Sequence, residues 1–120
     1  MASITKAFIK GSDNQIVVTL TENGVGITGT WTSLAIFIGY PTAIVTINRT
    51  SDQDGVALNT STGVLTITPG KLTENLAALL SGALHRVWVK VISTANPEGV
   101  DFGAKDSDAK LYFEIQDRPT

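Results

Sequence analysis

The feature that most constrains the fold is a long apolar strand pattern at residues 83–94, ALHRVWVKVIST. It follows a shorter strand pattern at residues 63–68, a Pro-Gly break and a leucine-rich segment, LTENLAALLSG. We assign much of the core to the apolar residues of the two strand patterns, namely Val64, Leu65, Ile67, Val87, Trp88, Val89, Val91 and Ile92. The stretch from 63 to 94 is therefore expected to supply the centre of a β-protein.

Other segments along the chain have the same character. Short, β-branched and alternating runs are separated by turn-forming Gly, Pro, Asn and Asp residues. We expect strands at residues 4–10, 15–21, 31–38, 43–48, 56–59, 64–68, 83–94 and 108–116, an irregular edge segment near Val25 and Ile27, and a loop or bulged segment at 100–107. Strands at this spacing, about seven to nine of them, predict an all-β, immunoglobulin-like antiparallel β-sandwich in one domain, residues 1–120. A jelly roll and a small closed barrel remain open alternatives.

One short helical insert is expected near residues 72–81. Apolar side chains at positions 72, 76, 79 and 80 have helical spacing, Thr73 can cap the first turn, and Gly82 suits the stop. A segment this short depends on docking for its helicity. We interpret it as a plug over one end of the sandwich, with Leu76 among its buried residues.

Composition excludes several classes of protein. The chain has no cysteine, so neither disulfides nor thiol chemistry contributes. Its nine Lys and Arg against eleven Asp and Glu are scattered, without the basic patch of a nucleic-acid binder. No apolar run approaches the length of a membrane helix, and the opening MASITKAFIKG is too polar for a secretory signal. We expect no nucleic-acid and no membrane partner.

The sequence does not favour an enzyme. His85 is the only histidine, so a Ser-His-Asp triad would have to use it, and no G-x-S-x-G pattern is present. We interpret His85 as a surface residue at the start of a strand. We therefore predict no catalytic residues.

Two groups of acidic residues are candidate metal ligands. Asp52 and Asp54 resemble half of a calcium loop, but position 63, where the bidentate Glu belongs, is Gly. Asp101, Asp106 and Asp108 fit the tip of a solvated hairpin. We predict no metal site and no cofactor.

Aromatic residues offer one further binding mode. Phe37, Trp88 and Phe113 lie within strand patterns and are expected mostly in the core. Tyr40 and Phe102 lie near loop glycines and are the candidate exposed aromatics for a carbohydrate platform.

Four motifs together resemble a family of small phage virion domains. They are the turn FIKGSDN at 8–14, the tryptophan-led strand GTWTSLAIFI at 29–38, the segment TGVLTITPGKLT at 62–73, and the stop LLSGA at 79–83. The family includes head decoration or cement proteins and the N-terminal immunoglobulin-like domain of siphophage baseplate upper proteins. In the family the stop typically leads into a tyrosine-rich strand, whereas here LHRVWVKV follows.

The resemblance implies a structural role in a virion that is assembled in the host cytoplasm. The leading expectation is a capsid cement protein that binds the major capsid protein or other virion proteins. Self-association is a further candidate contact. The alternatives are a tail, baseplate or fibre adaptor and, from a different class, a carbohydrate-binding module. A chain that begins at Met1 without room for a second domain suits a small accessory subunit. We expect partner contacts from two polar terminal arms, formed by Ala2, Ser3, Ile4, Thr5 and Lys6 and by Asp117, Arg118, Pro119 and Thr120.

Overall fold

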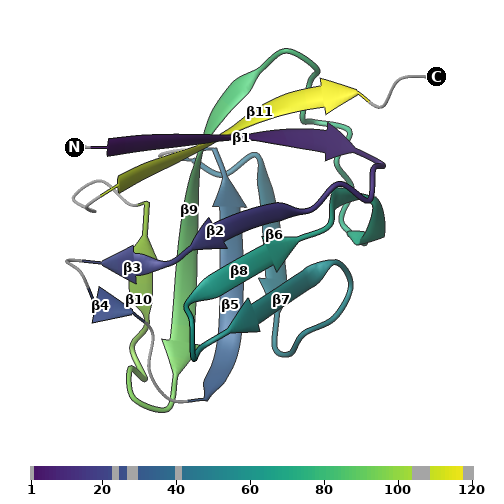
Figure 1. The fold of residues 1–120 in the computed structure, drawn as a ribbon. Helices are drawn as coiled ribbons and strands as arrows, with labels where there is room; N and C mark the ends of the chain where they lie inside the picture. Colours follow the sequence, from purple (N-terminus) through teal and green to yellow (C-terminus); the bar gives the residue numbers. More distant parts are fainter. Residues whose placement is uncertain (1, 23–24, 27–29, 40–41, 104–108, 118–120) are drawn as a thin grey trace.

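Two β-sheets pack face to face in the computed structural model, which describes residues 2–22, 25–26, 30–39, 42–103 and 109–117. The larger sheet has six strands: β1 (Ala2–Lys10), β11 (Ala109–Asp117), β9 (Leu84–Ser93), β5 (Trp31–Ile38), β6 (Val45–Arg49) and β10 (Val100–Phe102). The smaller sheet has three: β2 (Ile16–Thr19), β8 (Val64–Ile67) and β7 (Val56–Asn59). The short strands β3 (Thr21–Glu22) and β4 (Val25–Gly26) form a separate ribbon. Figure 1 shows the smaller sheet in front of β9, β5 and β6.

The strand order is that of an immunoglobulin-like domain. The larger sheet runs β1-β11-β9-β5-β6, and the smaller runs β2-β8-β7. In immunoglobulin nomenclature β2, β8 and β7 take the positions B, E and D, whereas β11, β9, β5 and β6 take G, F, C and C′. Strand β1 pairs parallel with β11, and the other pairs are antiparallel. The predicted all-β, immunoglobulin-like sandwich is confirmed.

The core follows from the period-two alternation of the strands. Strand β5 buries Leu34, Ile36 and Ile38, and its intervening residues are only partly buried. Strands β9, β2, β8 and β7 bury alternate residues in the same way. The rings of Phe8 and Phe113, with centroids 5.5 Å apart, fill the end of the core under β1 and β11.

Strands β10 and β11 both pair with the same edge of β9. Val100–Phe102 pair with Val91–Val89, and Leu111 pairs with Val87, so both strands use one edge of β9 in turn. Gly103 ends β10 with a φ of +79°, and a Cβ at this position would lie 2.6 Å from the carbonyl oxygen of Val87. Residues 100–102 are thus a strand within the segment that was predicted to be a loop or bulge.

The predicted helix near residues 72–81 is wrong. The helical turn that the structure contains in this region is the 3-10 helix η1 (Pro69–Lys71), and the residues after it form turns. Leu79 N–H donates to Leu76 O, and Ala83 N–H donates to Leu80 O, which are three-residue turn contacts rather than α-helical ones. Tertiary anchors hold this segment, so the helical spacing of its leucines did not produce a helix.

The same segment still closes one end of the sandwich. Leu79 is fully buried, and Lys10 Nζ donates a hydrogen bond of 2.6 Å to its carbonyl oxygen. Leu72 and Leu76 pack against the core from partly buried positions, whereas Leu80 is 68% exposed. The plug is therefore centred on Leu79 and not on Leu76. Within the described ranges, no helix has the length and apolar character needed to cross a membrane.

Candidate functional site

The predicted N-terminal arm is part of the fold. Residues 2–6 form the first half of β1, which pairs with β11 from Ala2↔Ala109 to Lys10↔Asp117. The strand expected at 4–10 is confirmed and begins at Ala2, so residues 2–6 pair with β11 within the chain and do not form a free terminal arm. A partner contact by Ala2, Ser3, Ile4, Thr5 or Lys6 stays a prediction.

The C-terminal arm is only partly described. Asp117 ends β11, and its carboxylate lies 3.3 Å from Lys10 Nζ. Arg118, Pro119 and Thr120 lie outside the described residues, and their role as partner contacts also stays a prediction.

His85 points into the sandwich rather than to its surface. It lies on the inward side of β9 and is paired in register with Phe113. Its Nε2 is buried and has no hydrogen-bond partner among the residues that the structure describes. The interpretation of His85 as a surface residue is therefore wrong, and Nε2 has no hydroxyl to activate.

Two of the candidate acidic side chains, those of Asp52 and Asp101, accept hydrogen bonds within the fold. Asp52 Oδ1 accepts the backbone N–H of Leu58 at 3.0 Å, and Asp101 Oδ1 accepts the indole N–H of Trp88 at 2.9 Å. Asp106 and Asp108 lie outside the described residues. Among the described residues no cluster of three or more His, Asp and Glu side chains is placed to hold a metal ion.

A buried ion pair joins Arg49 at the end of β6 to Glu74 in the plug segment. Arg49 Nη1 and Nη2 donate to the two carboxylate oxygens of Glu74 at 2.6 and 2.9 Å. The remaining donors of Arg49 bind the carbonyls of Asn48, Gln53 and Asp54. The side chains of Arg49 and Glu74 are 4% and 20% exposed. One guanidinium therefore fixes both the 50–55 loop and the plug.

This contact changes the ionisation of both partners. The hydrogen bonds from Arg49 lower the pKa of Glu74, although burial opposes the shift. The same hydrogen bonds raise the pKa of Arg49, again against burial. The pair is a structural clamp, because its donors and acceptors are directed at each other and at the backbone.

The outer face of the six-stranded sheet carries an aromatic cluster, which we name the aromatic face: Phe37, Arg86, Trp88 and Tyr112. Phe37 and Trp88 are register partners on β5 and β9, with ring centroids 4.7 Å apart and planes inclined by 40°. Arg86 and Tyr112 are register partners on β9 and β11. All four are partly buried on the side of the sheet opposite the core.

Hydrogen bonds fix the orientation of this cluster. Trp88 Nε1 donates to Asp101, and Arg86 Nε and Nη2 both donate to the carbonyl oxygen of Gly103, at 3.2 and 3.0 Å. The side chains therefore project from a rigid sheet in set positions. Aromatic and arginine side chains held in this way are the residue types enriched in protein interfaces.

Sequence reasoning missed this face. Phe113 is buried as expected, but Phe37 and Trp88 lie on the outer side, so their assignment to the core is wrong. In β9, Trp88 shares its side with Arg86 and Lys90, whereas Val87, Val89 and Val91 take the other side, so this alternation was the available signal for Trp88. The alternation in β5, where Leu34, Ile36 and Ile38 take one side, was the available signal for Phe37.

The carbohydrate platform expected from Tyr40 and Phe102 is not supported by the position of Phe102, the one of the two that the structure describes. Phe102 is 4% exposed and belongs to the core, because it faces inward at the end of β10. Tyr40 lies outside the described residues.

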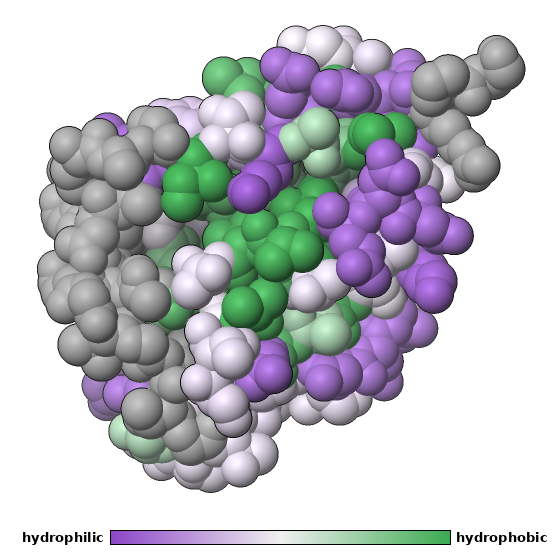
Figure 2. All heavy atoms as spheres, in the orientation of Figure 1, coloured by the Kyte–Doolittle hydropathy of each residue, from purple (hydrophilic) through white to green (hydrophobic). Residues whose placement is uncertain are grey.

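A second apolar area lies on the opposite face of the sandwich, in the middle of the view in Figure 2. On the outer side of the smaller sheet Val17 of β2, 47% exposed, projects beside Thr66 and Ala57, its neighbours in register. These side chains are small and lack an aromatic or arginine anchor. The aromatic face is the better candidate for tight contact with a protein.

Comparisons with known proteins give only distant likenesses. No protein-family model matches the chain, and no curated protein is significantly similar to it. The first immunoglobulin-like domain of human CD48 antigen aligns with 98% of this chain and 87% of its own, at 13% identity and a TM-score of 0.40. The extracellular domains of the voltage-gated sodium channel β4 subunit align with 99% and 95%, at 15% identity and a TM-score of 0.42. Likeness at this level carries no argument about function, and the immunoglobulin-like description of the chain rests on its strand order.

Proposed function

We propose that this chain is a non-catalytic structural protein of a phage virion, a cement or decoration protein that binds the major capsid shell. The observation that carries the proposal is the aromatic face, where Phe37, Arg86, Trp88 and Tyr112 project from the outer side of the larger sheet. The sequence motifs that resemble phage decoration proteins support the same class of partner. Localisation in the virion, after assembly in the host cytoplasm, is part of this proposal.

The aromatic face has the chemistry of a protein-binding surface. Partly buried aromatic rings gain apolar burial when a partner covers them, and their few rotatable bonds limit the entropy lost. Arg86 adds a planar donor in the same cluster, already held by the carbonyl of Gly103. In a closed shell, many copies bind at once, so each contact need only be modest.

A tail, baseplate or fibre adaptor is the second candidate within the same class. It would use the same face on a different virion protein, and the sequence motifs at 8–14 and 62–73 fit it equally. The identity of the protein that the aromatic face contacts distinguishes the two.

Co-sedimentation with expanded empty capsids of the phage that encodes the chain tests the proposal. The wild-type protein is expected to pellet with the capsids, and Trp88→Ala is expected to weaken binding by at least about tenfold. Trp31→Ala removes a tryptophan at the start of β5 and serves as the matched control. Absence of wild-type binding to capsids would overturn the cement role, and binding to isolated tail or baseplate complexes instead would select the adaptor.

A further inference from the structure

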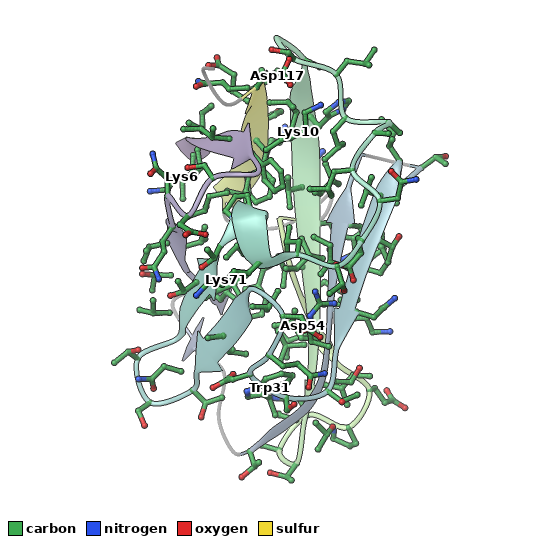
Figure 3. All side chains as sticks on the ribbon, turned by 90° about the vertical axis from the view of Figure 1, so that its right-hand side faces the viewer. Lys6, Lys10, Trp31, Asp54, Lys71 and Asp117 are labelled. Carbon is green, nitrogen blue, oxygen red and sulfur yellow. The ribbon has the colours of Figure 1, made fainter. Side chains whose placement is uncertain are left out.

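A groove with both polar and apolar lining lies at the edge of the smaller sheet, away from the aromatic face. Its volume is about 610 Å³, and it is bounded by the start of β5, the outer side of β7 and β8, and the turn that joins them. In Figure 3, Trp31 lies below Asp54, toward the lower end of the sandwich in that view. The volume of the groove exceeds those of four other recesses on the molecule, which range from about 30 to about 540 Å³.

The lining combines one indole with hydroxyl, amide and carboxylate groups. Trp31 is partly buried and packs against the core, so its position is supported from behind. Asn59 and Asp52 provide oxygen acceptors, and Thr62 and Thr66 are among the threonines that provide hydroxyls. Asp52 is oriented by the N–H of Leu58, and Asn59 by the N–H of Ser61.

The charge of the lining narrows the class of ligand. Asp52 is its single charged residue, and neither lysine nor arginine contributes to it. An anionic ligand would therefore meet an unbalanced carboxylate instead of a counter-ion. The lone carboxylate thus disfavours an anion, and the hydroxyl and amide groups in the rest of the lining match a ligand rich in hydroxyl groups.

We infer that this groove binds a neutral saccharide, with one pyranose ring against Trp31. The C–H face of a pyranose is apolar and suits an indole, whereas its equatorial hydroxyls require acceptors and donors around the rim. Asp52, Asn59 and the threonine hydroxyls form that rim. The site differs from the platform expected at Tyr40 and Phe102 and shares no residue with it.

The groove continues beyond the first ring position. A second recess of about 250 Å³ shares Asp52, Ala57 and Thr66 with it and extends to Gln15 and Thr68. The floor that the two recesses share is Ala57, an exposed residue on the edge strand β7. This continuity favours an oligosaccharide over a monosaccharide, because additional rings can lie along β7.

Intrinsic fluorescence and amide NMR test the inference directly. Trp31 and Trp88 are the two tryptophans of the chain, so Trp88→Phe leaves Trp31 as the single reporter. The probes are neutral gluco-, manno-, galacto- and N-acetylglucosamine oligosaccharides, with sialyl-lactose and a threonine-rich peptide for comparison. We expect a neutral oligosaccharide to change Trp31 fluorescence and to shift the amide signals of residues 57–66.

Variants separate binding from folding. Ala57→Gln fills the shared floor from an exposed position and leaves the indole in place, so it should weaken saccharide binding by at least about tenfold without unfolding the protein. Trp31→Ala should abolish binding, and Trp88→Ala should preserve it. The inference is overturned if no neutral probe binds at millimolar concentration, if sialyl-lactose or the peptide binds more tightly, or if Ala57→Gln leaves binding unchanged. Capsid binding is measured separately and does not depend on this result.

Discussion

Replacing Glu74 with Gln removes the carboxylate from the buried clamp and leaves Arg49 in place. The guanidinium of Arg49 would keep its contacts with three backbone carbonyls but lose its counter-ion and two charge-assisted hydrogen bonds of 2.6 and 2.9 Å. Breaking a fully buried pair costs about 3–5 kcal/mol, and because the Glu74 side chain is 20% exposed we expect the lower end, about 3 kcal/mol. The clamp fixes two loops, so the loss should appear in global unfolding.

The pH dependence of stability also tests the Arg49–Glu74 clamp. Arg49 lowers the pKa of Glu74 in the folded protein, so the unfolded chain binds a proton there at higher pH than the folded chain does. The stability supplied by Glu74 is complete above the ordinary glutamate pKa and is lost as the pH falls through the lowered, folded-state value. Glu74→Gln should therefore be less stable than wild type at neutral pH, and the difference should shrink in acid.

Urea unfolding, followed by tryptophan fluorescence from neutral to strongly acidic pH, measures both effects. Glu98→Gln makes the same chemical change at an exposed position and should leave stability nearly unaltered. A loss below about 1 kcal/mol for Glu74→Gln at neutral pH, or a difference from wild type that does not shrink in acid, would refute the clamp.

Three further predictions concern the core and the backbone. Leu79→Ala should cost about 2–5 kcal/mol in urea unfolding and Leu76→Ala clearly less, because only Leu79 is fully buried; equal losses would contradict the placement of the plug. His85→Leu removes a buried nitrogen without a partner, so the melting temperature should stay level or rise, and a loss above about 1 kcal/mol would mean that Nε2 has a partner in solution. Gly103→Ala should cost at least about 1 kcal/mol, because its Cβ would meet the Val87 carbonyl at a positive φ; calorimetry showing no change would contradict this backbone conformation.

The sandwich was predictable because most of its strands bury one side only. Strands β2 and β6 alternate buried and exposed residues along their whole length, and turn residues mark the ends of the strands. Strand β9 also buries alternate residues, but its apolar run Val87, Trp88 and Val89 hides this alternation when only the three residues are considered. The run was therefore assigned to the core as a whole, although Arg86 and Lys90, on the same side of the strand as Trp88, indicate that Trp88 faces outward.

The errors in the plug and in β1 arise from contacts between residues far apart in the chain. Leucine spacing at 72, 76 and 79 is compatible with a helix, but Arg49 holds Glu74 from 25 residues away and Lys10 binds the carbonyl of Leu79 from 69 away. The pattern at 4–10 predicts a strand, but it does not show that β11, more than a hundred residues later, pairs with residues 2–6. A local sequence pattern does not indicate contacts with residues so far away in the chain.

Site-specific photo-cross-linking provides the most direct test of the proposal that the aromatic face meets the virion. A photoreactive amino acid at Ala35, on the outer side of β5 opposite Lys90 and next to the Phe37–Trp88 pair, would be compared with the same group at Ala57 in the groove. On incubation with capsids, we expect a covalent product with the major capsid protein from position 35 and none from position 57. A capsid cross-link from position 57 alone, or from neither position, would contradict the proposal.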